Sequence, residues 1–124
     1  MRKSEPNLGK SKSIYNLAML RYSNISRLDD STLLTEAYYE VIKELLVSLL
    51  ARDGYKPDDH VDIIKYMYKC GFEDCDFFLI DELRKRRNQI QYDGLHISSD
   101  YLRRNKPRFN NVIMRLKKIC ENKF

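Results

Sequence analysis

The stretch DDSTLLTEAYYEVIKELLVSLLARDG, residues 29–54, decides the fold of this 124-residue chain. Its apolar side chains recur at three- and four-residue spacing and cover more than half the circumference of an α-helix. They are Leu34, Ala37, Tyr38, Val41, Ile42, Leu45, Leu46, Leu49 and Leu50. So wide an apolar surface is typical of a helix that packs against two or three others, and we expect it at the centre of a bundle.

Capping and chain-breaking residues set the limits of this helix and of four others. Residues 29–32 offer side-chain acceptors to the free N–H groups at its start, and Gly54 follows its end at about Arg52. The other helices are predicted from about Ser13 to Leu28, from 57–59 to about Cys70, from about Glu73 to Tyr92, and from 98–100 to about Asn122. Short links between long helices favour an all-α, up-and-down bundle of about five helices.

The first and last helices carry narrower apolar stripes. On the first, we expect the buried face to comprise Ile14, Leu17, Ala18, Arg21, Tyr22, Ile25 and Leu28. On the last, it comprises Leu102, Phe109, Val112, Ile113, Leu116 and Ile119. Pro107 lies inside this last pattern and predicts a kink there, or a helix that begins in two pieces. No stretch alternates well enough to predict a strand.

Length and composition indicate a single domain, residues 13–124, behind a flexible polar lead-in of residues 1–12. The N-terminal residues show no apolar core typical of a signal peptide, and no apolar run approaches the roughly 20 residues that span a bilayer. We therefore expect a cytoplasmic protein without a membrane segment. Three cysteines, an odd number, predict reduced and buried thiols. Zinc bound by Cys70, Cys75 and a histidine is the weaker alternative, since paired zinc ligands stand closer in sequence. We expect neither a metal nor a cofactor.

Charge is distributed unevenly along the chain. Residues 1–28 have six basic and one acidic side chain, residues 29–82 have five basic and 14 acidic, and residues 84–124 have 12 basic and three acidic. The net charges are therefore +5, −9 and +9, which sum to the +5 of the whole chain. The basic last third is expected to attract polyanions, or the acidic middle of the same chain or of a second subunit.

One cation falls on an apolar face of the predicted fourth helix. At 100° per residue, Arg87 lies on the face of Leu79, Ile80, Leu83 and Ile90, beside a polar stripe of Asp81, Arg84, Asn88 and Gln91 that extends round to Tyr92. A guanidinium in an apolar setting is costly to bury unless its donors find acceptors. We therefore expect Arg87 to meet a carboxylate, a carbonyl, a subunit partner or a phosphate.

The segment LRKRRNQIQYDG, residues 83–94, resembles the signature helix of the HEPN superfamily of nucleotide- and RNA-associated helical bundles. The helix order over roughly residues 13–120 is similar too. In that family an arginine is followed by a polar residue, often asparagine, and by a histidine four to six residues beyond the arginine. Arg87 and Asn88 match this pattern, whereas Tyr92 stands where the histidine is expected and His96 lies nine residues beyond Arg87.

The resemblance implies either a metal-independent ribonuclease, whose site forms where two subunits meet, or a non-catalytic form. It also implies that the protein belongs to a toxin–antitoxin system. Because a phenol holds its proton at neutral pH, Tyr92 is a poor general base, and the absence of the histidine favours a non-catalytic or weakly active domain.

The leading hypothesis is a homodimer, with the fourth helix at its contact, that binds RNA or a nucleotide through a basic face on the fourth and fifth helices. Its site residues would be Arg84, Arg87, Asn88, Tyr92, Arg103 and Arg104. Two alternatives stay open: a HEPN-type ribonuclease in which Tyr92 or His96 replaces the histidine, and a protein-binding accessory subunit of a minimal nucleotidyltransferase.

Overall fold

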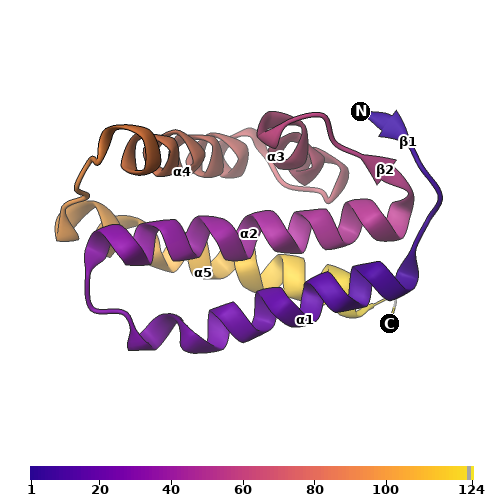
Figure 1. Ribbon diagram of the computed structural model, residues 1–124, viewed down its shortest axis with the longest axis horizontal. Coiled ribbons are helices and arrows are strands. Elements are labelled where there is room, and N and C mark those ends of the chain that lie inside the picture. Colours follow the sequence, from indigo (N-terminus) through magenta and orange to yellow (C-terminus); the bar gives the residue numbers. More distant parts are fainter. Residues whose placement is uncertain (123) are drawn as a thin grey trace.

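The computed structural model describes residues 1–122 and 124. Within these residues the chain forms five α-helices: α1 (Leu8–Asn24), α2 (Ser31–Asp53), α3 (His60–Lys69), α4 (Asp74–Asp93) and α5 (Ser99–Glu121). The chain direction reverses from α1 to α2, again at α4, and again at α5 (Figure 1). The prediction of an all-α bundle of about five helices is therefore confirmed. No helix in the described part of the chain is long and apolar enough to cross a membrane.

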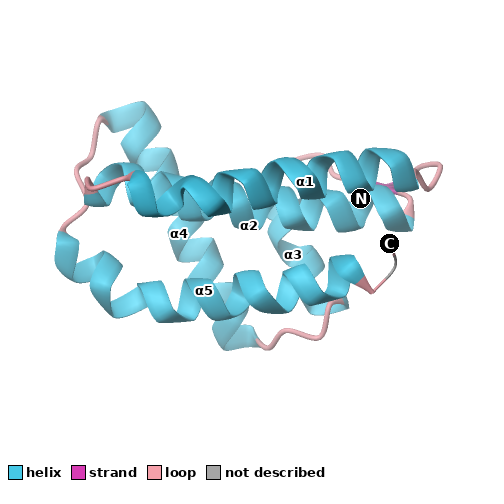
Figure 2. Ribbon diagram, turned by 90° about the horizontal axis from the view of Figure 1, so that it is seen from below, coloured by secondary structure: helices cyan, strands magenta, loops and turns pink. Residues whose placement is uncertain are grey.

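Helix α2 is the centre of the bundle, as its wide apolar surface predicted. It contacts each of the other four helices. Helix α1 lies along one side of it, α3 and α4 lie along the other side, and α5 lies behind it (Figure 1). The view in Figure 2 places α5 opposite the α1–α2 pair. The side chains of Leu45, Leu46 and Leu49 are fully buried, because α2 packs against other helices on most sides.

The ends of α2 are set by the residues that the sequence indicated. The Asp30 carboxylate accepts hydrogen bonds from the backbone N–H groups of Thr32 and Leu33, at 2.9 and 3.0 Å. Gly54 ends the helix in the left-handed conformation, with φ of +80°. A Cβ atom at Gly54 would lie 2.7 Å from the Ser4 carbonyl oxygen, so glycine is required there for space as well as for conformation.

The N-terminal part of the chain differs from the prediction. Helix α1 begins at Leu8 rather than at about Ser13, because the Asn7 side chain accepts a hydrogen bond from the Lys10 backbone N–H at 2.9 Å and caps the helix. Upstream of it, β1 (Arg2–Lys3) pairs antiparallel with β2 (Tyr55–Lys56). The expectation of no strand was therefore wrong, and the lead-in is joined to the chain segment that follows α2.

Two expectations also need correction, one about the continuity of α5 and one about the buried face of α1. Helix α5 continues through Pro107, so the alternative of a helix in two pieces is wrong. On α1, which ends in a 3₁₀ turn (η1, Ile25–Arg27), Ala18 and Ile25 are buried as expected. Leu17 is 45% exposed and its neighbour Leu20 is 59% exposed. The buried face of α1 is thus narrower than the sequence suggested, and leucine side chains remain on its surface.

Candidate functional site

The predicted acceptor for Arg87 is a carboxylate of the same chain. The Arg87 Nη2 atom lies 3.1 Å from the Glu40 Oε1 atom, across the contact between α4 and α2. The two side chains are only 13% and 24% exposed. Among the described residues the buried Nε atom of Arg87 has no hydrogen-bond partner. Of the four acceptors expected from the sequence, an internal carboxylate is the one that the structure shows.

An aromatic pair adjoins this ion pair. The guanidinium of Arg87 lies 5.5 Å from the centroid of the Tyr39 ring. The His60 ring, at the start of α3, stacks on Tyr39 with a centroid separation of 6.0 Å. The Tyr39 hydroxyl and His60 Nδ1 are hydrogen-bonded at 3.0 Å. A histidine and the predicted arginine therefore contact the same tyrosine ring.

The charges of this region act on one another. Burial raises the pKa of the Glu40 carboxyl, but the hydrogen bond from Lys43 and the charges of Lys43 and Arg87 outweigh burial, and the net effect is a lowered pKa. Burial, together with the charges of Lys43 and Arg87, lowers the pKa of His60 and so favours its neutral ring. Burial raises the pKa of Tyr39 to about 12.

Arg84 and Asn88 complete this polar region, which we call the inner cluster. It consists of Tyr39, Glu40, Lys43, His60, Asp81, Arg84, Arg87 and Asn88. Both Nε and Nη2 of Arg84 lie 2.9 Å from Asp81 Oδ1, one turn away on α4. The Asn88 side-chain oxygen accepts from Arg87 at 3.4 Å. Both arginines of the inner cluster are thus already paired with carboxylates.

The other three predicted site residues lie at the far end of α4 and the start of α5. Tyr92 is 80% exposed. The short link of residues 94–98 joins it to α5, where Arg103 and Arg104 are also exposed. Arg103 pairs with the Asp100 carboxylate, and Arg104 donates to the Asp100 carbonyl oxygen at 3.3 Å. The structure therefore divides the six predicted residues into a shielded group and an exposed group.

The sequence reasoning missed members of both groups. Lys106 and Arg108 extend the exposed charge of Arg103 and Arg104, and their signal was the run RRNKPR at residues 103–108. We call Tyr92, Arg103, Arg104, Lys106 and Arg108 the basic end. The inner cluster also contains four residues that the sequence reasoning did not predict for the site: Tyr39, Glu40, Lys43 and His60. Their only local signal was a Glu40–Lys43 pair spaced by one helical turn.

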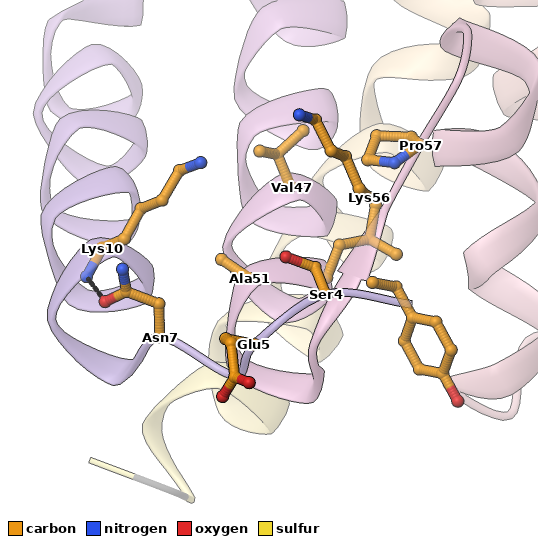
Figure 3. A pocket seen from close by; sticks show the side chains of 10 residues that line it. Ser4, Glu5, Asn7, Lys10, Val47, Ala51, Lys56 and Pro57 are labelled. Carbon is orange, nitrogen blue, oxygen red and sulfur yellow. Dashed lines mark hydrogen bonds between the residues drawn. The ribbon is translucent and has the colours of Figure 1, made fainter. Parts of the chain in front are cut away.

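The three cysteines belong to neither group. Cys120 is buried, Cys70 is half-buried and Cys75 is exposed, so the expectation of buried thiols is wrong for Cys75. Within residues 1–122 and 124 no three His, Cys, Asp or Glu side chains are grouped to hold a metal ion. A small pocket of about 180 Å³ lies near the N-terminus, with Lys10 and Lys56 beside it (Figure 3). It contains none of the predicted site residues.

No family model, no curated protein and no solved structure matches this chain.

Proposed function

We propose that this chain is a HEPN-type domain that binds RNA or a nucleotide through its basic end and does not cleave RNA efficiently. The observation that carries the proposal is the contrast between shielded and exposed arginines. Arg84 and Arg87 are shielded and paired with Asp81 and Glu40. Arg103 is also paired, with Asp100, but both side chains are largely exposed. A phosphate can therefore reach it, as it can reach the exposed Arg104, Lys106 and Arg108.

The arrangement of these cations favours a polynucleotide over a single phosphate. Arg103, Arg104, Lys106 and Arg108 spread over about 200° of the helix surface at 100° per residue. One phosphate group contacts a small part of such an arc, whereas an extended backbone can follow it. The exposed ring of Tyr92 adds a surface on which a base can stack, a contact worth about 1–3 kcal/mol per base. Single-stranded RNA meets both requirements.

A lack of efficient cleavage follows from what surrounds the exposed cations. A general base has to lie within hydrogen-bond reach of the ribose hydroxyl and has to be unprotonated at neutral pH. Tyr92 offers only a phenol, and phenols are poor general bases near neutral pH. Of the two histidines, His60 belongs to the inner cluster, beside Tyr39. His96 lies in the exposed link between α4 and α5, where no side-chain hydrogen bond within the described residues fixes its ring.

The proposal is tested by fluorescence anisotropy with a labelled single-stranded RNA at low salt. Arg103→Ala/Arg104→Ala should weaken binding about tenfold, because two phosphate contacts are lost. The matched control is Lys65→Ala/Lys69→Ala, which removes the same charge from exposed positions on α3. Equal losses for both double variants would show that net charge alone, and not the basic end, determines binding.

A second candidate function, a metal-independent ribonuclease, is favoured by one observation. His60 and Arg87 contact the same ring, that of Tyr39, so an imidazole and a guanidinium both lie against one residue. A proton acceptor and a charge stabiliser are the two groups that such a reaction needs. The assay is incubation of single-stranded RNA without metal. Efficient cleavage that is abolished by His60→Ala and by Arg87→Ala would replace binding by catalysis as the function.

A further inference from the structure

The small pocket near the N-terminus joins three separate segments of the chain. The residues that precede α1, the first turn of α1 and β2 each contribute polar side chains, namely Ser4, Glu5, Asn7, Lys10 and Lys56 (Figure 3). Val47 and Ala51 of α2 contribute apolar side chains. The pocket volume of about 180 Å³ is far larger than a single water molecule requires. The pocket therefore has room for a small polar group of a ligand.

Backbone hydrogen bonds hold the pocket in shape independently of any ligand. The N–H of Ser4 donates to the carbonyl oxygen of Gly54 at 2.8 Å. The N–H of Asn7 donates to the carbonyl oxygen of Ala51, also at 2.8 Å. These bonds fix the chain that precedes α1 across the end of α2, and the pairing of β1 with β2 places Lys56 beside it. The side chains of the pocket thus extend from a fixed backbone, which reduces the entropy lost on binding.

The polar side chains of the pocket are mostly donors of hydrogen bonds. Lys10 and Lys56 have no ion-pair partner within residues 1–122 and 124. The side-chain oxygen of Asn7 caps α1, which leaves its N–H groups for another acceptor. Ser4 extends to the same side as the two lysine side chains, whereas the Glu5 carboxylate points the opposite way (Figure 3). The lysine side of the pocket therefore suits a ligand that is an acceptor and an anion.

The surroundings of the pocket also favour an anion. Helix α1 begins at the pocket, and the first turn of a helix carries partial positive charge. Asp58, two residues beyond Lys56, is paired with Arg2 at 3.0 Å. A dianionic phosphate group balances both lysine charges and has oxygens enough for every donor, whereas a carboxylate brings one charge and two oxygens. Phosphate is thus the better match.

We propose that this pocket binds the terminal phosphate group of a phosphomonoester. Lys10 and Lys56 supply the charge, and the Ser4 hydroxyl and the Asn7 amide orient the phosphate oxygens. A phosphodiester inside a polynucleotide carries one charge and is linked on both sides, so it fits a small pocket less well. The site is separate from the basic end and does not depend on RNA binding there.

The test is an NMR titration of the isotope-labelled full chain with methyl phosphate at pH 8, at constant ionic strength. The backbone amide signals of Ser4, Lys10 and Lys56 should shift and saturate. Acetate, with the same methyl group and half the charge, should bind about tenfold more weakly. Lys10→Gln/Lys56→Gln should weaken methyl phosphate binding about tenfold or more, because two charged donors are lost. The matched control is Lys65→Gln/Lys69→Gln on α3, which should bind as the native chain does.

The source of the phosphate is distinguished by a second titration. A short RNA with a 5′-phosphate is compared with the same RNA that ends in a 5′-hydroxyl. If only the phosphorylated RNA shifts the pocket amides, and does so at lower concentrations than methyl phosphate, the ligand is the end of a nucleic acid. If methyl phosphate binds more tightly, the ligand is a small phosphomonoester.

Three results would overturn the proposal. Shifts that sodium chloride reproduces, or that do not saturate, would mean that the lysines attract ions without forming a site. Acetate that binds as tightly as methyl phosphate would exclude phosphate as the preferred group. Affinity that Lys10→Gln/Lys56→Gln leaves unchanged would mean that phosphate binds elsewhere. Arg103→Ala/Arg104→Ala should not change methyl phosphate binding, so failure here is distinct from failure of the basic end to bind RNA.

Discussion

Replacing Glu40 by methionine should destabilise the chain more than replacing Arg87 by methionine. The two side chains form one ion pair, but their other contacts differ. Without Arg87, Glu40 keeps the Lys43 ammonium at 2.8 Å. Without Glu40, Arg87 keeps a long hydrogen bond to Asn88 at 3.4 Å and its contact with the Tyr39 ring, and its buried Nε atom still lacks an acceptor among the described residues.

The expected size follows from the exposure of the pair. Leaving one charge of a fully buried pair unpartnered costs about 3–5 kcal/mol, whereas an exposed pair contributes about 0–1 kcal/mol. Side chains that are 13% and 24% exposed lie between these limits, so we expect about 2 kcal/mol for Glu40→Met. For Arg87→Met we expect about 1 kcal/mol or less. The double variant should be more stable than Glu40→Met, since no guanidinium is left without its carboxylate and only the partly exposed Lys43 ammonium loses a partner.

The effect of pH provides a second check on the same pair. The pKa of Glu40 is lowered from its ordinary value of 4.5, so its ionised form stabilises the fold. This stabilisation is fully present above pH 4.5 and is lost as the pH falls through the lowered pKa. Urea unfolding at pH 7 and near pH 3 should therefore show the cost of Glu40→Met shrinking in acid. An Arg87→Met cost larger than that of Glu40→Met, or a cost that does not depend on pH, would refute the reasoning.

Two further predictions concern the backbone and the thiols. Gly54→Ala should destabilise the chain by about 2–4 kcal/mol in urea unfolding, because strain at a φ of +80° adds to a clash with Ser4, whereas Gly71→Ala has open space and should cost only about 1–2 kcal/mol; equal costs would contradict this. With a thiol reagent at pH 8, the exposed Cys75 should react at once, and Cys120 should react only on unfolding, because it is buried and burial raises its pKa to about 11. Rapid loss of all three thiols in the native state would exclude this packing.

The sequence predicted the centre of the bundle well for a physical reason. A residue such as Leu45 or Leu46 lies in an apolar pattern that repeats over the whole of α2. The width of that pattern around the helix indicates how many other helices pack against it. The caps at Asp30 and Gly54 are local as well, since each depends on residues within one helical turn. The short strands could not be read in the same way. A pair of two-residue strands leaves no alternating pattern, and the pairing of Arg2 with Lys56 depends on where α2 ends in space.

The candidate site was predicted in part for similar reasons. The helical wheel placed Arg87 on an apolar face and required an acceptor for it, but it could not name Glu40, 47 residues away on another helix. His60 was overlooked because only the packing of α3 against α2 brings it to Tyr39. Exposure is also a tertiary property. In the sequence, Arg84 and Arg103 are both members of basic runs and cannot be told apart. The structure shields Arg84 and leaves Arg103 open to solvent.

The salt dependence of RNA binding tests the central claim, that the basic end holds a nucleic-acid backbone, most directly. For single-stranded nucleic acid, each phosphate contact contributes about 0.7 to the slope of the logarithm of affinity against the logarithm of salt concentration. Arg103→Ala/Arg104→Ala should therefore flatten the slope by about 1.4. Asp100→Asn should strengthen binding, because it releases Arg103 from its carboxylate. No binding at low salt, or a slope that the double variant leaves unchanged, would contradict the account.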